Sequence, residues 1–327
     1  MRRNPMRNRL PAQLLALGGA LLLLAFVLAG CGPTTSTAST PGSSQPLIAQ
    51  DATGTPIKIP AKAPQRIVSL TAGDSEILGA LGAASRVVAV DLTTDYPAAM
   101  AAITPKLDVY STSAANLTEQ IVALKPDLVL SWGGFTSKVD QSLTQAGLNV
   151  VDLPAKDLSG TLTEIRLVGQ LIHAESTANH LVDSLQARIN AVKAKVQGAP
   201  PVSVYIELGY TPPPPFAYGG GSFGDEIIRD AGGTNIFGNV TSSGGFPAVS
   251  DESIIAANPQ IIILTGGPQY SGDPVSVTRR PGWATITAVK TGRVYSIDPN
   301  PIQRPGPRLV DALEQVAKLI HPDRFGA

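Results

Sequence analysis

The chain has 327 residues, of which 25 are basic, 25 are acidic and one is cysteine. Residues 1–30 contain four arginines and no acidic residue, so the rest of the chain carries 21 basic against 25 acidic residues, a net charge of −4. A net negative chain without a basic run argues against nucleic acid as a partner, and a single cysteine excludes an internal disulfide.

The N-terminus has the pattern of a lipoprotein signal peptide. The arginines precede an apolar run from about Leu14 to Leu28, and the exit, Leu-Ala-Gly-Cys, ends at Cys31 and resembles the bacterial lipobox. We expect residues 1–30 to be removed and Cys31 to carry a lipid, so that the protein is extracytoplasmic and anchored to the cell membrane. The alternative is an ordinary transmembrane anchor with an incidental cysteine. Residues 31–63, rich in Ser, Thr, Gly and Pro after Cys31, predict a flexible tether.

From Pro64 onward, short aliphatic runs alternate with helical patterns, which is typical of parallel sheets covered on both faces. Residues 159–198 read as helical, with a break near Ala174–Ser176 and then a helix of about 22 residues. Such a helix is about 33 Å long, enough to bridge two lobes; the alternative is two surface helices of one lobe. We predict an α/β fold with two lobes, residues 64–158 and 199–327, each a parallel-sheet α/β sandwich, joined by one long rigid helix. Strands are expected at 66–70, 86–90, 128–132, 150–153, 202–207, 261–264 and 294–297.

One sequence pattern occurs twice. EQIVALKPDLVLSWGG at 119–134 aligns without a gap with ESIIAANPQIIILTGG at 252–267. The two segments share a glutamate, an isoleucine, an alanine, a proline and a Gly-Gly pair, and each reads as a helix, a turn, a buried strand and a glycine-rich exit. The repetition indicates two similar lobes and singles out Glu119 and Glu252, charged residues repeated among apolar neighbours.

Patterns of catalysis are missing. The sequence contains no P-loop, no G-x-S-x-G and no H-E-x-x-H. The three histidines, His173, His180 and His321, do not cluster by spacing, and neither imidazole nor thiolate is concentrated enough for a transition-metal site. We therefore expect a protein that is not an enzyme and has no metal site or cofactor of its own.

Aromatic residues gather where strands end, and ligands of open parallel sheets lie outside the carboxyl ends of the strands. Trp132 precedes Gly133-Gly134, and the proline-rich loop GYTPPPPFAYGGG is expected to hold Phe216 and Tyr218 outward. These residues suit a broad apolar, planar or macrocyclic ligand. Tyr96, Tyr110 and Phe246 are further loop aromatics expected near it.

The chain resembles the periplasmic substrate-binding proteins of ABC importers for vitamin B12, haem and iron–siderophore complexes, and the cobalamin-binding kind most. The resemblance covers about residues 64–322. It is carried by RIVSLTAGDSEILGALG, TTDYP, NLTEQIVALKPDLVLSWGG, PAVSDESIIAANPQIIILTGG and RPGPRLVDALEQVAKLI. It implies a monomeric, lipid-anchored binding protein that captures cobalamin between two lobes and delivers it to a permease dimer with its ATPase subunits.

The resemblance also implies site residues. Glu119 and Glu252 stand where members of the family carry one exposed glutamate on each lobe, which engages arginines of the permease subunits. Trp132, Phe216 and Phe246 match positions of aromatics against the corrin, Phe246 in place of a tryptophan. Arg304 matches a ligand-facing arginine, Asn300 stands where an aspartate is found, and Thr93 where a tyrosine is usual, with Tyr96 and Tyr110 near it in sequence.

Two alternatives remain at the level of the sequence. An anionic iron–siderophore complex would be held by several cations, for which Arg279, Arg280 and Arg304 are candidates, and haem would take Tyr210 or Tyr218 as an iron ligand. A more distant alternative is a cell-surface enzyme or sensor on the same two-lobe fold.

Overall fold

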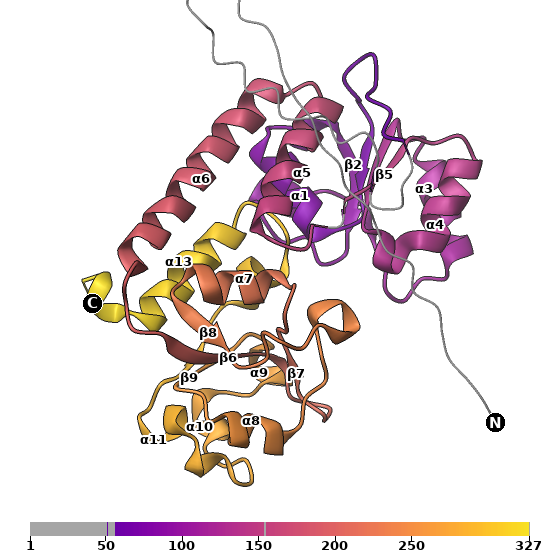
Figure 1. The fold of residues 1–327 in the computed structure, drawn as a ribbon. Helices are drawn as coiled ribbons and strands as arrows, with labels where there is room; N and C mark the ends of the chain where they lie inside the picture. Colours follow the sequence, from indigo (N-terminus) through magenta and orange to yellow (C-terminus); the bar gives the residue numbers. More distant parts are fainter. Residues whose placement is uncertain (1–50, 52–55, 154, 327) are drawn as a thin grey trace, which may run out of the picture. The chain divides into compact units, whose positions relative to one another are not determined.

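Two mainly parallel sheets, each covered by helices on both faces, follow one another along the chain (Figure 1). The computed structural model describes residues 51, 56–153 and 155–326, so the predicted signal peptide, Cys31 and most of the tether lie outside the described residues. Residues 46–327 belong to one compact unit.

The first sheet has the strand order β3-β2-β1-β4-β5, and all of its pairings are parallel. β2 and β3 are added on one side of β1, and β4 and β5 on the other side. The carboxyl end of β1 is therefore a topological switch point, the place where open α/β sheets bind ligands. The strands are β1 (Ile67–Ser69), β2 (Val87–Asp91), β3 (Lys106–Leu107), β4 (Leu128–Ser131) and β5 (Val150–Asp152). The helices are α1 (Ala72–Ala80), α2 (Ala98–Ala101), α3 (Ala114–Ala123), α4 (Gly133–Gln145) and α5 (Leu158–Leu171).

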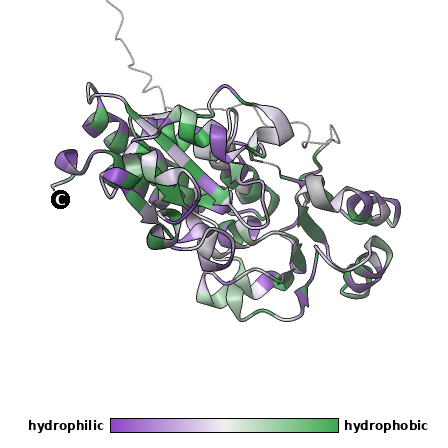
Figure 2. Ribbon diagram, turned by 90° about the horizontal axis from the view of Figure 1, so that it is seen from below, coloured by the Kyte–Doolittle hydropathy of each residue, from purple (hydrophilic) through white to green (hydrophobic). Residues whose placement is uncertain are grey.

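Alternation along these strands decides which helices cover which face. Ile67 and Leu130 pack in one core with α1 and α5, whereas Val68 and Val129 pack in another with α3 and α4. Because both faces are covered, β1 and β4 are buried along their whole length. In Figure 2 much of the interior is green, and the ribbons around it carry both green and purple segments.

The second sheet has the order β10-β9-β6-β7, with β8 also paired to β6. Its pairings are parallel except for β6 with β7, which is antiparallel. The strands are β6 (Val202–Gly209), β7 (Phe216–Ala217), β8 (Gly233–Asn235), β9 (Ile261–Leu264) and β10 (Val294–Ser296). The helices are α7 (Phe223–Asp230), α8 (Asp251–Ala257), α9 (Gly267–Tyr270), α10 (Pro274–Val277), α11 (Thr287–Lys290), α12 (Pro299–Gln303) and α13 (Leu309–Ile320).

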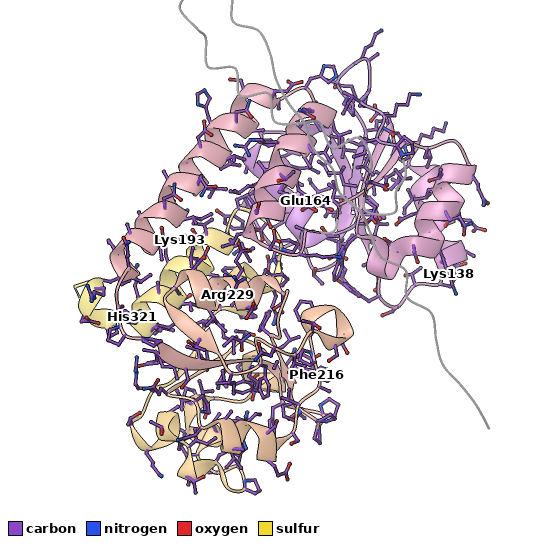
Figure 3. All side chains as sticks on the ribbon, viewed as in Figure 1. Lys138, Glu164, Lys193, Phe216, Arg229 and His321 are labelled. Atoms are coloured by element: carbon purple, nitrogen blue, oxygen red, sulfur yellow. The ribbon has the colours of Figure 1, made fainter. Side chains whose placement is uncertain are left out.

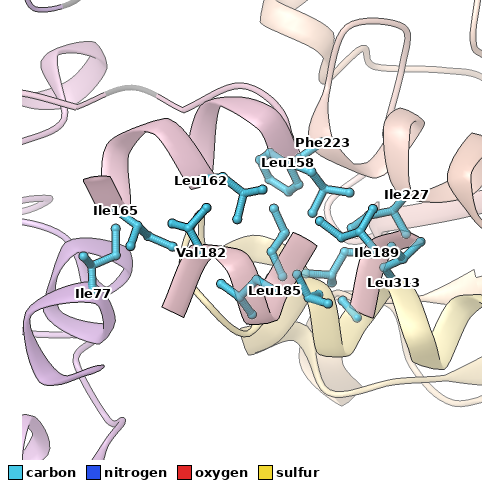
Figure 4. Close-up of a cluster of buried hydrophobic side chains, with 14 of the residues drawn as sticks. Ile77, Leu158, Leu162, Ile165, Val182, Leu185, Ile189, Phe223, Ile227 and Leu313 are labelled. Carbon is cyan, nitrogen blue, oxygen red and sulfur yellow. The ribbon is translucent and has the colours of Figure 1, made fainter. Parts of the chain in front are cut away.

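The long helix α6 (Glu175–Val196) has 22 residues and runs between the two sheets along the sequence. It begins after a break in which His173 adopts a positive φ of 58°. Its apolar stripe packs on α5 and on α13, and a single hydrophobic core continues from α1 through α5 and α6 to α7 and α13 (Figure 4). The predicted fold class, two α/β lobes joined by one long helix, is confirmed.

The two copies of the repeated pattern fold alike. α3 and α8 each end in a residue with positive φ, Lys125 (50°) and Asn258 (45°), and a buried proline follows one position later. β4 then pairs in parallel with β1, and β9 pairs in parallel with β6, with the equivalent residues Leu128 and Ile261 beginning the two pairings. Among the described residues, no helix is long and apolar enough to cross a membrane.

Candidate ligand site

The loop that follows β2 is shaped by Asp91. The buried carboxylate of Asp91 accepts a hydrogen bond from the backbone N–H of Thr93 (2.9 Å) and another from the Thr93 hydroxyl. Burial raises the pKa of Asp91, and the bonds from Thr93 act in the opposite direction. This turn places Thr93, Asp95 and Tyr96 just beyond the carboxyl ends of the parallel strands.

Arg304, between α12 and α13, meets this loop from the second half of the chain. Its guanidinium donates to both carboxylate oxygens of Asp95 and to the carbonyl of Thr93 (3.1 Å). The side-chain amide of Asn300, on α12, also donates to Asp95 (3.1 Å). Thr93, Asn300 and Arg304, which the resemblance implied as ligand contacts, therefore lie together around Asp95, a residue that the sequence analysis did not identify.

A second ion pair lies beside the first. Arg308 donates two hydrogen bonds to Glu76 on α1, at 3.0 and 2.5 Å, and its guanidinium lies over the ring of Tyr96, 4.2 Å from the ring centroid. The bond to Glu76 raises the pKa of Arg308, which keeps the guanidinium charged. Glu76 is buried, so this bidentate pair fastens the start of α13 to the first lobe.

The second lobe offers two exposed aromatic rings, Phe216 and Tyr270, of which Phe216 was predicted from the sequence. Phe216, labelled in Figure 3, is 41% exposed on β7. Phe246 is half-buried and packs edge-on against Tyr218, with ring centroids 5.6 Å apart. The expectation that the proline-rich loop holds Tyr218 outward is wrong, because Tyr218 is only 1% exposed. Its ring lies directly over Gly224, where a Cβ would come within 2.3 Å of it, so the glycine at the start of α7 lets the ring turn inward.

The remaining predicted aromatics belong to the first lobe. Trp132 follows β4 directly, is half-buried and occupies the position before α4. Tyr96 and Tyr110 are exposed, in the loops that follow β2 and β3. Strand ends of the first sheet thus carry three of the aromatic side chains predicted from the sequence.

Arg280 does not serve the role considered for it in an anionic-ligand site. It donates to both oxygens of the buried Glu207, at 2.6 and 3.0 Å, and lies over the rings of Tyr210 and Trp283. Arg280 is itself buried, so the charge is neutralised inside the second lobe. Of the candidates for the alternative ligands, Arg280 and Tyr218 are therefore both buried inside the second lobe.

A sequence model of the periplasmic binding protein family matches residues 67–301. The chain belongs to this family. YvrC of Bacillus subtilis strain 168, described as an uncharacterized ABC transporter substrate-binding lipoprotein, is 32% identical over 319 residues, which are 94% of this chain and 96% of YvrC. The vitamin B12-binding protein of Vibrio vulnificus strain CMCP6 is 27% identical over 259 residues, 78% of this chain and 89% of that protein.

A solved structure from Saccharomonospora viridis DSM 43017, described as an ABC-type Fe3+-hydroxamate transport system, has a TM-score of 0.67 and 27% identity. The match covers 86% of this chain and 98% of that one. As a periplasmic binding protein, the chain is a substrate-binding protein of an ABC transporter, a class that works with permease and ATPase components.

The repeated glutamates of this periplasmic binding protein are both on the surface. Glu119 is exposed on α3, and Glu252 is exposed in the first turn of α8. The backbone N–H of Glu252 itself and the side chain of Ser250 lower the pKa of Glu252. Two residues after each glutamate, Ile121 and Ile254 are fully buried, so the two helices present matching faces to the solvent.

In the part of the chain that the structure describes, no three His, Cys, Asp or Glu side chains lie together in a way that could hold a metal ion. The carboxylates around the site, Glu76 and Asp95, are paired with arginines instead. Hydrogen-bonding groups and exposed aromatic rings at strand ends are typical of sites that bind small-molecule ligands.

Proposed function

We propose that this protein captures a corrinoid, cobalamin, between its two lobes and delivers it to the permease of an ABC importer. The similarity to a vitamin B12-binding protein over 78% of the chain supports this cargo. The distribution of charge and of aromatic side chains supports it independently.

The observation that carries the proposal is the neutralisation of the cations at the site. A ferric complex with several negative charges needs unpaired cations around it. At the site, Arg304 is paired with Asp95 and Arg308 with Glu76. Arg280 is paired with Glu207 inside the second lobe, and the exposed Arg279 lies outside these pairs. A bulky ligand without net charge, such as cyanocobalamin, suits a site whose charges already cancel.

The side chains that line the proposed site suit a flat macrocycle. The rings of Tyr96, Tyr110 and Phe216 are exposed, and those of Trp132 and Phe246 are half-buried, so each has surface to offer a corrin. Thr93, Asn300 and Arg304 supply polar groups for its amide side chains. We propose these eight residues as the ligand contacts and omit Tyr218.

We further propose that the protein is a monomer held at the membrane by a lipid on Cys31. The described part of the chain begins beyond that residue, and support comes from the lipobox and from YvrC, which is named a lipoprotein. The proposed division is a signal peptide at 1–30, a tether at 31–63, lobes at 64–158 and 199–327, and a helical region at 159–198.

Tryptophan fluorescence tests the cargo. The chain contains two tryptophans: Trp132 at the proposed site, and Trp283, which is fully buried and donates its indole N–H to Asp251 (3.1 Å). We expect cyanocobalamin to quench Trp132 saturably at sub-micromolar concentration in the chain from Pro46 onward. Trp132→Phe should abolish the quenching and leave the emission of Trp283 as a constant background.

Haemin, a ferric catecholate and a ferric hydroxamate serve as competing ligands in the same titration. No response to cyanocobalamin would overturn the corrinoid assignment. A saturable response to one iron complex alone would replace the cargo and leave the role as a substrate-binding protein intact.

A further inference from the structure

Arg304, Arg308, Glu76 and Asp95 form a cluster of charged side chains. Asp95 is its most exposed member. Its side chain is 50% exposed, whereas that of Arg304, to which it is paired, is 14% exposed. Both terminal nitrogens of Arg304 donate hydrogen bonds to the carboxylate of Asp95, and the side-chain amide of Asn300 donates a third. A solute that approaches Arg304 therefore meets the Asp95 carboxylate first.

The charge of Asp95 is firmly held. Its partial burial disfavours the ionised form, but the hydrogen bond and the charge of Arg304, together with the charge of Arg308, lower the pKa of Asp95 overall. Arg308 approaches one carboxylate oxygen to 4.0 Å while remaining bound to Glu76. Two arginines thus face two carboxylates, and the cluster as a whole is neutral.

This pairing occupies the geometry by which an arginine recognises an anion. A guanidinium fork binds a carboxylate or phosphate through two parallel hydrogen bonds, and Asp95 already takes both from Arg304. An anionic ligand can use the fork only by displacing Asp95, which would leave a like charge beside the ligand. A neutral ligand meets no such repulsion.

We propose that Asp95 is a specificity-determining residue that excludes anionic ligands by acting as a built-in anion on Arg304. The inference rests on the proposed function, since it names the feature that separates a neutral corrinoid from haem propionates and ferric catecholates. Specificity of this kind arises from an element that repels the wrong ligand, and Asp95 is that element.

Asp95→Asn tests the inference. The amide is close in shape to the carboxylate but removes the main partner of Arg304, which keeps only Glu76, 3.8 Å away and already bound to Arg308. We expect the affinities for haemin and for a ferric catecholate to rise at least tenfold relative to the affinity for cyanocobalamin. The new affinity should fall as salt concentration rises, because it comes from an ion pair at a partly exposed site.

Two further variants make the result decisive. Asp95→Asn combined with Arg304→Gln should lose the gain, because the freed guanidinium is what binds the anion. Asp183→Asn removes the same charge from the exposed surface of α6 and should alter neither affinity. Unchanged anion binding in folded Asp95→Asn, or a gain that survives the loss of Arg304, would overturn the inference. A failure of the unmodified chain to bind cyanocobalamin would overturn the cargo instead, while the response of the anions to Asp95→Asn would still be measured.

Discussion

Glu164, labelled in Figure 3, is a buried acidic residue of α5 that forms no ion pair with any of the residues the structure describes. It is 6% exposed on α5, and one of its carboxylate oxygens has no hydrogen-bond partner; Asp74 on α1 is in the same situation. Burial, then the negative charge of Asp74, raises the pKa of Glu164 to about 10. Burial likewise raises the pKa of Asp74 to about 7. At neutral pH the folded chain therefore holds a proton on Glu164 that the unfolded chain releases.

Glu164→Gln should flatten the dependence of stability on pH. A raised carboxyl pKa contributes stability that is complete below the unfolded value near 4.5 and is lost as pH rises toward 10. Between pH 7.5 and 9.5 the free energy of unfolding should fall less steeply in the variant than in the wild type, by about 1.4 kcal/mol per pH unit. Urea denaturation at several pH values measures this slope. Glu175→Gln, at an exposed position on α6, is the control, and equal slopes in wild type and Glu164→Gln would contradict the prediction.

At the scale of elements, the repeated helix–turn–strand unit is the part that sequence describes best. β4 and β9 form at equivalent positions of the repeat, because the features that specify them, a short run buried along its whole length and a proline after the helix, are local. The two copies differ at the residue of positive φ that ends the helix. Asn258 tolerates this left-handed conformation, whereas Lys125 does so at a cost.

Lys125→Gly should therefore stabilise the protein. Glycine adopts a φ of +50° without a clash between Cβ and the backbone, so we expect a gain of about 1 kcal/mol in the free energy of unfolding. Ala123→Gly, at the last residue of α3, is the matched control and should destabilise, because glycine is a poorer helix former than alanine. Chemical denaturation measures both, and a loss of stability in Lys125→Gly would show that the lysine side chain outweighs the backbone strain.

Sequence patterns were sufficient to predict helices and strands but not the side-chain contacts between residues far apart in the sequence. The bounds of β9 match the predicted strand at 261–264, because the pattern that marks it, a short aliphatic run, is local. By contrast, Asp95 pairs with Arg304 across 209 positions, and Glu76 with Arg308 across 232. No local pattern encodes such a pair, so Asp95, Glu76 and Arg308 were missed. Tyr218 was misplaced for a similar reason, since the cavity that receives its ring is made by the later Gly224 and Phe246.

Across the folded unit, residues 46–327, several features hold the two lobes together. The core around α6 extends from α1 to α13 without interruption. The pairs Arg308–Glu76 and Arg304–Asp95 tie the start of α13 to the first lobe at the same time. A frame held by packed helices and ion pairs keeps its surface features at a fixed separation. Glu119 and Glu252, at equivalent positions of the repeat, are therefore presented in a fixed geometry, which suits docking to a two-fold permease.

Reversing both charges, Glu119→Arg with Glu252→Arg, should abolish uptake while the purified protein keeps its affinity for ligand. Both side chains are exposed and lie outside the ligand contacts proposed above, so we expect the change to act on the proposed contact with the permease and not on ligand binding. The measurement pairs cellular uptake of the ligand that quenches Trp132 with its affinity in solution. Glu175→Arg with Asp183→Arg makes the same change in net charge on α6 and should leave uptake intact, which separates a specific contact from a general effect of charge. If each glutamate contacts its own permease subunit, as we propose, each single reversal should lower uptake less than the pair. Normal uptake by the double variant would show that the repeated glutamates serve the fold alone.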